Sequence, residues 1–166
     1  MAGATPRPVI RPATPHDAER CGEIAVEAWR IVFESWRGLL GEKLWRQVFG
    51  DWQHQKRTSV ESQVRDSPDS AIVTEVDGEI VGFMTWRLHR ERGVGEISNN
   101  AVLPAWQGRG IGTEQCRHVL ERFREEKMAC ARVLTGGDEG HAAARAMYRA
   151  AGFERAIPYV EYFLEL

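Results

Sequence analysis

The sequence predicts a single α/β domain built around a mixed β-sheet. The candidate elements follow one another as a strand, two helices, three strands, a helix, a strand, a helix and one or two final strands. The apolar spacing is helical before residue 71 and strand-like directly after it. No internal repeat, linker or low-complexity tract divides the chain. We therefore expect one domain over residues 9–166, with about six to seven strands and about four helices, behind a flexible arm over residues 1–8.

The composition is that of an ordinary folded domain. The chain has 166 residues, of which 43% are apolar and 28% are charged, and its formal net charge is −2. A near-neutral net charge without a run of basic residues does not indicate a nucleic-acid-binding surface. No apolar stretch approaches the roughly 20 residues that a membrane-spanning helix needs, and Met1–Pro8 lacks the apolar core of a secretory signal. These features predict a cytoplasmic protein with neither a nucleic acid nor a membrane as partner.

The cysteines predict neither a disulfide framework nor a metal site. Cys21, Cys116 and Cys130 are odd in number and scattered along the chain, without the spacing of a zinc site. We expect all three to be buried thiols of a protein in a reducing compartment.

The first elements are a short strand and a helix start. Val9–Arg11 is a strand candidate that Pro12 ends. Thr14 is a suitable N-cap, and Pro15 suits the first position of a helix. Asp17 lies where a negative charge meets the positive end of the helix dipole. A helix is therefore expected to begin at about residue 15.

Two helices are predicted before residue 70. Gly38 and Gly41 are expected to end the first of them. The second is expected to begin near Glu42, to run through Val64 and to close over residues 66–69. The apolar residues that recur at helical spacing in the first helix are Cys21, Ile24, Ala25, Ala28, Trp29, Val32, Phe33 and Trp36.

Three strands follow in close succession. Residues 71–76 form the first strand, and residues 79–88 form the return strand. The pair Asp77-Gly78 between them is a strong hairpin-turn signal. The third strand covers residues 96–102 and is ended by Leu103-Pro104.

The later elements alternate between helix and strand. Residues 113–128 are predicted to form a helix, and residues 132–135 a buried strand. Residues 142–151 form an alanine-rich helix, which Gly152 ends at a position that favours a left-handed residue. Residues 157–166 are expected to hold one or two final strands.

A glycine-rich loop joins the strand over residues 96–102 to the next helix. Its sequence is Gln107-Gly108-Arg109-Gly110-Ile111-Gly112-Thr113. Glycines let the backbone approach a ligand closely, and amides at a helix N-terminus favour a phosphate or pyrophosphate. A Walker loop is excluded because the loop has no lysine, and a dinucleotide fingerprint is excluded because position 113 is threonine. A tight connection without a ligand is the remaining alternative.

Two segments together resemble a known family. Residues 100–112, Asn-Ala-Val-Leu-Pro-Ala-Trp-Gln-Gly-Arg-Gly-Ile-Gly, resemble the acyl-CoA-binding motif of the GNAT superfamily of N-acetyltransferases. Residues 146–153, Ala-Met-Tyr-Arg-Ala-Ala-Gly-Phe, resemble its second motif. The resemblance covers Val9 to Leu166 and implies the GNAT fold, with a mixed and mostly antiparallel sheet. It implies an acetyl-CoA-dependent N-acetyltransferase that uses no metal and moves an acetyl group to a primary amine by direct attack in a ternary complex.

The resemblance also assigns residues to the coenzyme. The amides of residues 108–113 would take the pyrophosphate, and the strand over residues 100–102 would take the pantetheine arm and the thioester carbonyl. The family commonly has asparagine seven residues before the motif's tyrosine, where this chain has His141, so this contact departs from the pattern. The implied coenzyme-binding residues are Asn100, Ala101, Val102, Gln107, Gly108, Arg109, Gly110, Ile111, Gly112, Thr113 and His141.

Two residues match the catalytic positions of the family. Tyr148 corresponds to the general acid that protonates the leaving thiolate, and its alternative role is that of a core tyrosine. Glu96 lies where protein-acetylating members place a glutamate base, and its alternative role is that of a solvated carboxylate at a strand end. Asp138, Glu139 and His141 are nearby substitutes for the base, and a chain of water molecules is another.

The sequence indicates where an acceptor binds but not which acceptor it is. In the family's fold the segment between the first two helices walls the acceptor pocket. Here this segment runs from Trp29 to Leu40 and implies Phe33, Glu34 and Trp36 as substrate-binding residues. The aromatic faces of Phe33 and Trp36 beside the Glu34 carboxylate suit a cationic amine. The alternative is that these aromatic residues, together with Trp45 and Trp52, are core residues, which their helical spacing favours. A small-molecule or peptide amine is the expected acceptor, and a homodimer is compatible with the sequence. The alternative function is a non-catalytic acyl-CoA-binding sensor or regulatory module.

Overall fold

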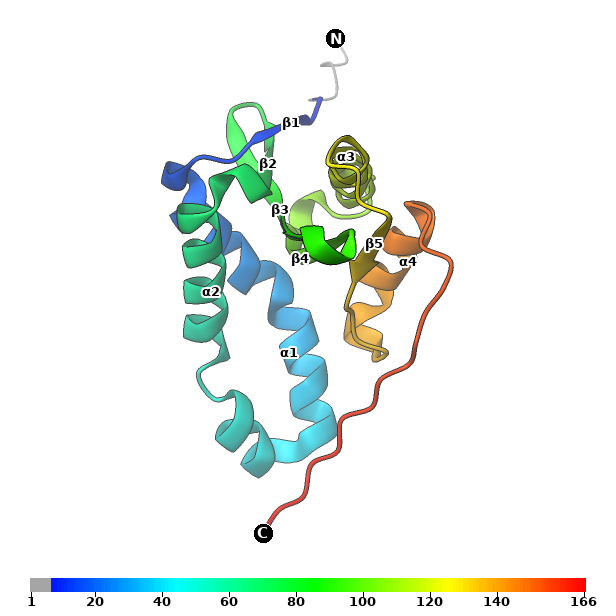
Figure 1. Cartoon of the computed structure of the whole chain (residues 1–166). Coiled ribbons are helices and arrows are strands. Elements are labelled where there is room, and N and C mark those ends of the chain that lie inside the picture. Colours follow the sequence, from blue (N-terminus) through cyan, green and yellow to red (C-terminus); the bar gives the residue numbers. More distant parts are fainter. Residues whose placement is uncertain (1–6) are drawn as a thin grey trace.

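The computed structural model describes residues 7–166, so most of the arm that the sequence predicts over residues 1–8 lies outside the described residues. Five strands form one sheet in the order β1-β2-β3-β4-β5 (Figure 1). Adjacent strands are antiparallel except β4 and β5, which are parallel. The strands are β1 (Val9–Pro12), β2 (Ala71–Val76), β3 (Glu79–His89), β4 (Val94–Val102) and β5 (Cys130–Val133). The predicted α/β fold with a mixed, mostly antiparallel sheet is confirmed.

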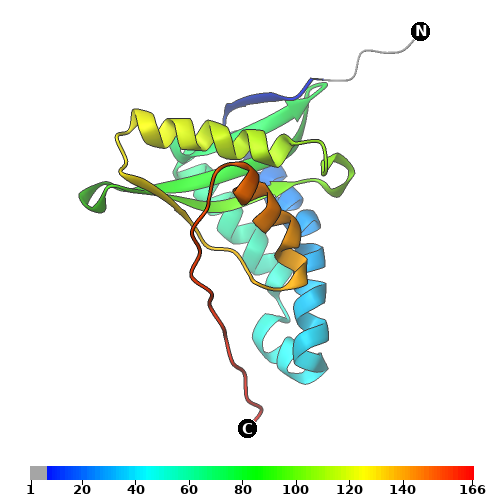
Figure 2. The ribbon, with the colours of Figure 1, turned by 90° about the vertical axis from the view of Figure 1, so that its right-hand side faces the viewer.

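Four helices of the described chain cover the two faces of the sheet (Figures 1 and 2). On one face, α1 (Ala18–Phe49) packs beside α2 (Trp52–Asp66). On the other face lie α3 (Ile111–Glu125) and α4 (Ala142–Ala150). No helix within residues 7–166 has both the length and the apolarity needed to cross a bilayer.

The two layers have separate apolar cores, because successive strand residues point to opposite faces of a sheet. Phe83 of β3 belongs to the core beneath α1 and α2, whereas its neighbour Met84 belongs to the core beneath α3 and α4. Both side chains are fully buried. The second core also holds Cys116 of α3 and Tyr148 of α4, so the tyrosine side chain is fixed by packing against the sheet.

A charged network fixes the start of α1. The amide and the hydroxyl of Thr14 donate to Asp17 Oδ2 at 2.7 and 2.9 Å, in agreement with the predicted helix start. The Arg11 guanidinium donates to both Asp17 oxygens, at 2.8 and 3.0 Å, and also to Glu75 on β2. The hydrogen bonds from Arg11 outweigh burial and lower the pKa of Asp17 to about 2.

We expect Asp17→Asn to destabilise the fold by about 2 kcal/mol near neutral pH and to matter less in acid. The folded pKa of Asp17 is about 2, below its ordinary value of 3.8. The stabilisation is therefore complete above about pH 5 and is lost as the pH falls from about 4 to about 2. Urea unfolding of both proteins at pH 6 and pH 3 measures the difference. Asp69→Asn, at an exposed aspartate, is the control, and an equal loss for Asp17→Asn at both pH values would contradict this account.

The junction between α1 and α2 agrees with the prediction only in part. Gly38 stays helical, whereas Gly41, with a φ of 74° and a ψ of 167°, leaves the helical conformation and divides α1 at a kink into two helical parts, so the predicted end of the first helix at Gly41 is confirmed. The chain turns over residues 50–51, and α2 begins at Trp52 rather than near Glu42. Residues between the kink and this turn stay helical, because their aromatic side chains pack against those of the first part of α1.

The final strands predicted over residues 157–166 do not form in the described structure, so the sheet has five strands rather than six to seven. This segment runs away from the sheet without a strand partner (Figure 2). Tyr162 and Leu164 are 91% and 80% exposed. Its end contacts α1 through an ion pair between Lys43 and Glu165 at 2.6 Å. An apolar pattern specifies a strand only where a neighbouring edge pairs with it, and this segment has no such pairing.

The strand β5 begins two residues earlier and is less buried than predicted. It covers Cys130–Val133 rather than residues 132–135, and its residues alternate between exposed and half-buried. The cause is its place as the outer strand, with one edge unpaired. Cys130 is exposed for the same reason, which corrects the expectation that all three cysteines are buried; Cys21 and Cys116 are buried.

Candidate active site

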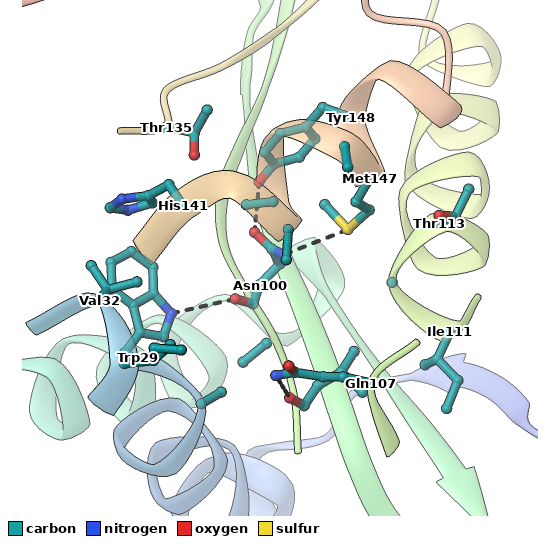
Figure 3. Close-up of a pocket in the computed structure, with 18 of the residues that line it drawn as sticks. Trp29, Val32, Asn100, Gln107, Ile111, Thr113, Thr135, His141, Met147 and Tyr148 are labelled. Atoms are coloured by element: carbon teal, nitrogen blue, oxygen red, sulfur yellow. Dashed lines mark hydrogen bonds between the residues drawn. The ribbon is translucent and has the colours of Figure 1, made fainter. Parts of the chain in front are cut away.

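A cleft of about 510 Å³ opens where β4 and β5 separate. The two strands pair only from Val94–Ile97 to Cys130–Val133, so β4 has a free edge from Ser98 onward. A β-bulge shifts the register of β4 against β3 at the same point. The cleft is lined by this free edge, by the loop before α3, by α4 and by one side of α1 (Figure 3).

The loop before α3 presents backbone to the cleft. Gly110 caps α3 with a φ of 81°, a left-handed conformation that glycine adopts at little cost. A Cβ at Gly108 or Gly110 would meet nothing within 4 Å, so the space beside the loop is open. Gln107 anchors the loop by donating to the Val102 carbonyl at 2.8 Å. Together with the first amides of α3 this loop forms a cradle that fits the pyrophosphate of a nucleotide coenzyme.

The structure brings most of the predicted coenzyme residues together. Ten of the eleven line the cleft: Asn100, Ala101, Val102, Gln107, Gly108, Gly110, Ile111, Gly112, Thr113 and His141. Arg109 does not, because its guanidinium lies 4.6 Å above the Trp106 ring and donates to the Ala105 carbonyl at 3.2 Å. Their contact with a coenzyme stays a prediction.

Tyr148 points from α4 toward the free edge of β4 (Figure 3). The residue is 6% exposed, and its hydroxyl donates to Asn100 Oδ1 at 2.7 Å. Burial, together with the neighbouring Cys116, raises the pKa of Tyr148 above its ordinary value. The phenol therefore stays protonated and is available as a proton donor in the cleft.

His141 lines the cleft at the N-terminus of α4. It is 7% exposed, and its Nδ1 lies 2.7 Å from Oδ1 of Asp138. Burial alone would raise the pKa of Asp138, but the neighbouring Trp36 and His141 side chains stabilise the carboxylate and lower it. An imidazole whose Nδ1–H faces a carboxylate keeps the lone pair of Nε2 free to accept a proton.

Glu96, the predicted base, does not line the cleft. Its carboxylate forms an ion pair with Arg132 Nη1 at 3.4 Å, and His89 Nε2 lies 3.5 Å away. The structure therefore brings Tyr148 and His141 together but does not bring Glu96 to them. The role of Glu96 stays a prediction from the resemblance.

The predicted substrate-binding residues do not line the cleft either. Phe33 is buried in an aromatic cluster, with its ring stacked on that of Trp52 at 4.2 Å between centroids. Glu34 is exposed on the surface of α1. Trp36 lies at the border of the cleft, because its ring centroid is 5.7 Å from that of His141. The rings of Trp29, Trp45 and Phe49 also contact that of Phe33, and Phe163 contacts Phe49.

Trp29, which begins the segment predicted to wall the acceptor pocket, lines the cleft, and Lys56, which was not predicted, packs against its ring. Trp29 lines the cleft, and its Nε1 donates to the Asn100 carbonyl at 3.4 Å (Figure 3). The Lys56 ammonium lies 3.3 Å from the centroid of the Trp29 ring and donates to Asn99 Oδ1 at 2.8 Å. Burial lowers the pKa of Lys56 to about 8. No sequence pattern joins residues 29 and 56, so the contact between Lys56 and Trp29 could not be predicted.

The described residues offer no metal site, and the thiol on α3 beside Tyr148 is not activated. Within residues 7–166 no three or more His, Cys, Asp or Glu side chains are grouped so that they could hold a metal ion. Burial raises the pKa of Cys116 to about 11, so this thiol is not prepared for nucleophilic attack.

The fold and the cleft define a class of protein, the coenzyme-dependent acyltransferases: a strand edge, an amide cradle and a tyrosine converge on one cleft. Residues 33–153 match the model of the acetyltransferase (GNAT) family. Because this match covers more than half of the chain, the chain belongs to that family and is an enzyme of the N-acetyltransferase class.

Individual relatives are distant in sequence. An uncharacterized N-acetyltransferase of Archaeoglobus fulgidus is 29% identical over 116 residues, which cover 64% of this chain and 72% of that protein. A mycothiol acetyltransferase of Streptomyces griseus is 34% identical over 86 residues, or 52% of this chain, but the match spans only 27% of that protein.

Solved structures support the same fold. The PaiA N-acetyltransferase of Thermoplasma acidophilum, in complex with coenzyme A, has a TM-score of 0.70 at 15% identity, over 89% of this chain and 90% of that chain. A GNAT family acetyltransferase of Brucella melitensis, in complex with acetyl-CoA, has a TM-score of 0.61 at 22% identity, over 91% of this chain and 85% of that chain. These likenesses confirm the predicted GNAT fold.

Proposed function

We propose that the protein transfers the acetyl group of acetyl-CoA to a primary amine by direct attack within a ternary complex. The observation that carries this proposal is a single cleft in which the amide cradle of α3, the free edge of β4 and Tyr148 meet. The similar structures from Thermoplasma acidophilum and Brucella melitensis, which hold coenzyme A and acetyl-CoA, support the choice of donor.

Different residues of the cleft hold the coenzyme, stabilise the charge on the carbonyl oxygen and protonate the leaving group. Acetyl-CoA supplies an acetyl group that is already activated as a thioester. The amides of residues 108–113 hold the pyrophosphate, and the free edge over residues 100–102 holds the pantetheine arm and the carbonyl oxygen. An amide that donates to this oxygen also stabilises the negative charge that develops there during attack. Tyr148 gives its proton to the departing thiolate, for which its hydroxyl turns away from Asn100 Oδ1.

The acceptor is a small-molecule or peptide amine that enters beside α1. The wall of the cleft on this side is apolar and aromatic, with Ala28, Trp29, Ile31 and Val32. Glu34 and Trp36 are proposed to border the entrance rather than the cleft itself, whereas Phe33 is buried in the aromatic cluster. Trp36 has the clearest part in this border because its ring contacts that of His141.

Acetyl transfer to a panel of amines tests this function. Purified protein is incubated with acetyl-CoA and with pools of small primary amines and peptides, and both the released thiol and the mass of the acceptor are measured. We expect thiol release that depends on the acceptor and an equal amount of acetylated amine. Coenzyme binding without turnover on any amine would indicate the sensor or regulatory module instead.

A further inference from the structure

We propose that His141, held by Asp138, is the general base that takes the proton from the acceptor amine. The assignment rests on the proposed acetyl transfer, because the base acts on the amine that accepts the acetyl group. It concerns a residue in which this chain departs from the family pattern, since an asparagine at this position cannot take a proton.

The carboxylate orients the imidazole. Asp138 Oδ1 lies 2.7 Å from Nδ1, so the tautomer with the proton on Nδ1 is favoured and Nε2 is the basic nitrogen. Arg145 of α4 fixes the loop that carries the carboxylate, because its guanidinium donates to the Gly136 and Asp138 carbonyls. Asp138 is therefore a positioning residue, and His141 is the group that meets the substrate.

Two glycines allow the loop backbone to pack closely against His141 and Asp138. A Cβ at Gly136 would collide with Nδ1 of His141 and with Oδ1 of Asp138. A Cβ at Gly140 would lie 2.9 Å from Oδ2 of Asp138 and 2.9 Å from the Val32 Cα. The backbone thus packs against the carboxylate from two sides, and Oδ2 is buried. This close packing keeps the carboxylate against the imidazole.

The position of His141 relative to Tyr148 suits a base and an acid. His141 is the N-cap of α4 and Tyr148 lies seven residues further along the chain in α4, and both line the cleft. Asn100 accepts a hydrogen bond from the Tyr148 hydroxyl and, through its carbonyl, one from Trp29, whose ring contacts that of His141 (Figure 3). This spacing leaves room for the amine near His141 and for the leaving sulfur near Tyr148.

Few charged groups face the imidazole. On the α1 side the His141 ring packs against the rings of Trp29 and Trp36, at 5.9 and 5.7 Å between centroids. Neither tryptophan titrates. From β4 the cleft wall is formed by Asn100, which is also neutral. The titratable groups around it are Asp138 on its own loop, Arg145 and Tyr148 on α4, and Lys56 of α2 against the Trp29 ring.

The proposed proton path balances the reaction. The acceptor arrives as an ammonium and gives one proton to Nε2 of His141, which leaves a neutral amine as the nucleophile. The C–N bond forms as the C–S bond breaks, and Tyr148 protonates the leaving thiolate. The second amine proton, released as the amide forms, restores the phenol, and the imidazolium gives its proton to solvent.

Removal of the imidazole tests the proposal. His141→Ala is expected to lower kcat by about 10²- to 10³-fold with less than about a threefold change in the KM for acetyl-CoA, and added imidazole is expected to restore part of the rate. His141→Asn keeps a hydrogen-bonding side chain without a base. Its rate is expected to rise about tenfold per pH unit until the acceptor amine deprotonates by itself. His118→Ala, at an exposed histidine of α3, is the matched control.

A second measurement does not depend on turnover. Nitrogen-15 NMR of the ligand-free protein is expected to show the His141 proton on Nδ1 and a free Nε2. Asp138→Asn is expected to shift this tautomer population and to lower kcat about tenfold.

The outcomes separate this proposal from the proposed function. An active wild-type protein with an unchanged pH–rate profile in His141→Asn would overturn the assignment, as would a proton found on Nε2. Loss of rate at low pH alone in Glu96→Gln would give the role to Glu96 and also overturn it. Failure of the wild-type protein to acetylate any amine would overturn the proposed function and this assignment together.

Discussion

Tyr148→Phe is expected to lower kcat by about 10²- to 10³-fold and to leave the affinity for acetyl-CoA within about threefold of the wild type. The substitution removes only the hydroxyl, which donates to Asn100 Oδ1 at 2.7 Å. Without this hydroxyl the thiolate must leave unprotonated. The ring still packs against Phe153, at 5.7 Å between centroids, so the core beneath α4 is kept. Steady-state kinetics and calorimetric titration with acetyl-CoA measure the two quantities separately.

Tyr162→Phe is the matched control for this prediction, because Tyr162 is 91% exposed in the C-terminal segment. In Tyr148→Phe, Asn100 loses its hydrogen-bond donor, which is expected to lower the free energy of unfolding by about 1 kcal/mol. A loss of this size leaves the protein folded and cannot account for the expected fall in kcat. A wild-type kcat in Tyr148→Phe would show that Tyr148 is a core residue and not the acid.

The parts of the site that the sequence predicted are those that local backbone geometry fixes. The loop over residues 107–113 needs glycines that cap α3 and leave its amides open, and these glycines are visible in the sequence. The turn at Asp77 and Gly78, with φ values of 51° and 82°, forms the predicted hairpin for the same reason. Such features depend only on residues that are neighbours along the chain.

The base and the acceptor wall depend instead on contacts between distant segments. Glu96 pairs with Arg132 because the β4–β5 register places the two residues opposite one another, and a single sequence does not give this register. Phe33 stacks on Trp52 of the second helix. Helical spacing shows that Phe33 lies on an apolar face, but it does not show whether a helix or a ligand covers that face.

Gly110→Val is expected to weaken acetyl-CoA binding by about 10- to 100-fold. Gly110 caps α3 with a φ of 81°, which a β-branched residue strongly disfavours. The loop must therefore change its backbone, and the amides at the start of α3 no longer point together into the cleft. A hydrogen bond to a charged group contributes about 1.5–3 kcal/mol, so the loss of one such bond to the pyrophosphate lowers affinity by about this factor. Calorimetric titration with acetyl-CoA measures the effect.

Gly78→Val separates this loss of affinity from backbone strain alone. Gly78 has a φ of 82°, and a Cβ there, as at Gly110, would meet nothing within 4 Å. It lies in the β2–β3 hairpin and does not line the cleft. Both variants are expected to lose about 1–2 kcal/mol of unfolding free energy, because a left-handed backbone is costly for any residue with a Cβ. Only Gly110→Val should also lose affinity for acetyl-CoA, and equal affinities in the two variants would show that the cradle does not hold the coenzyme.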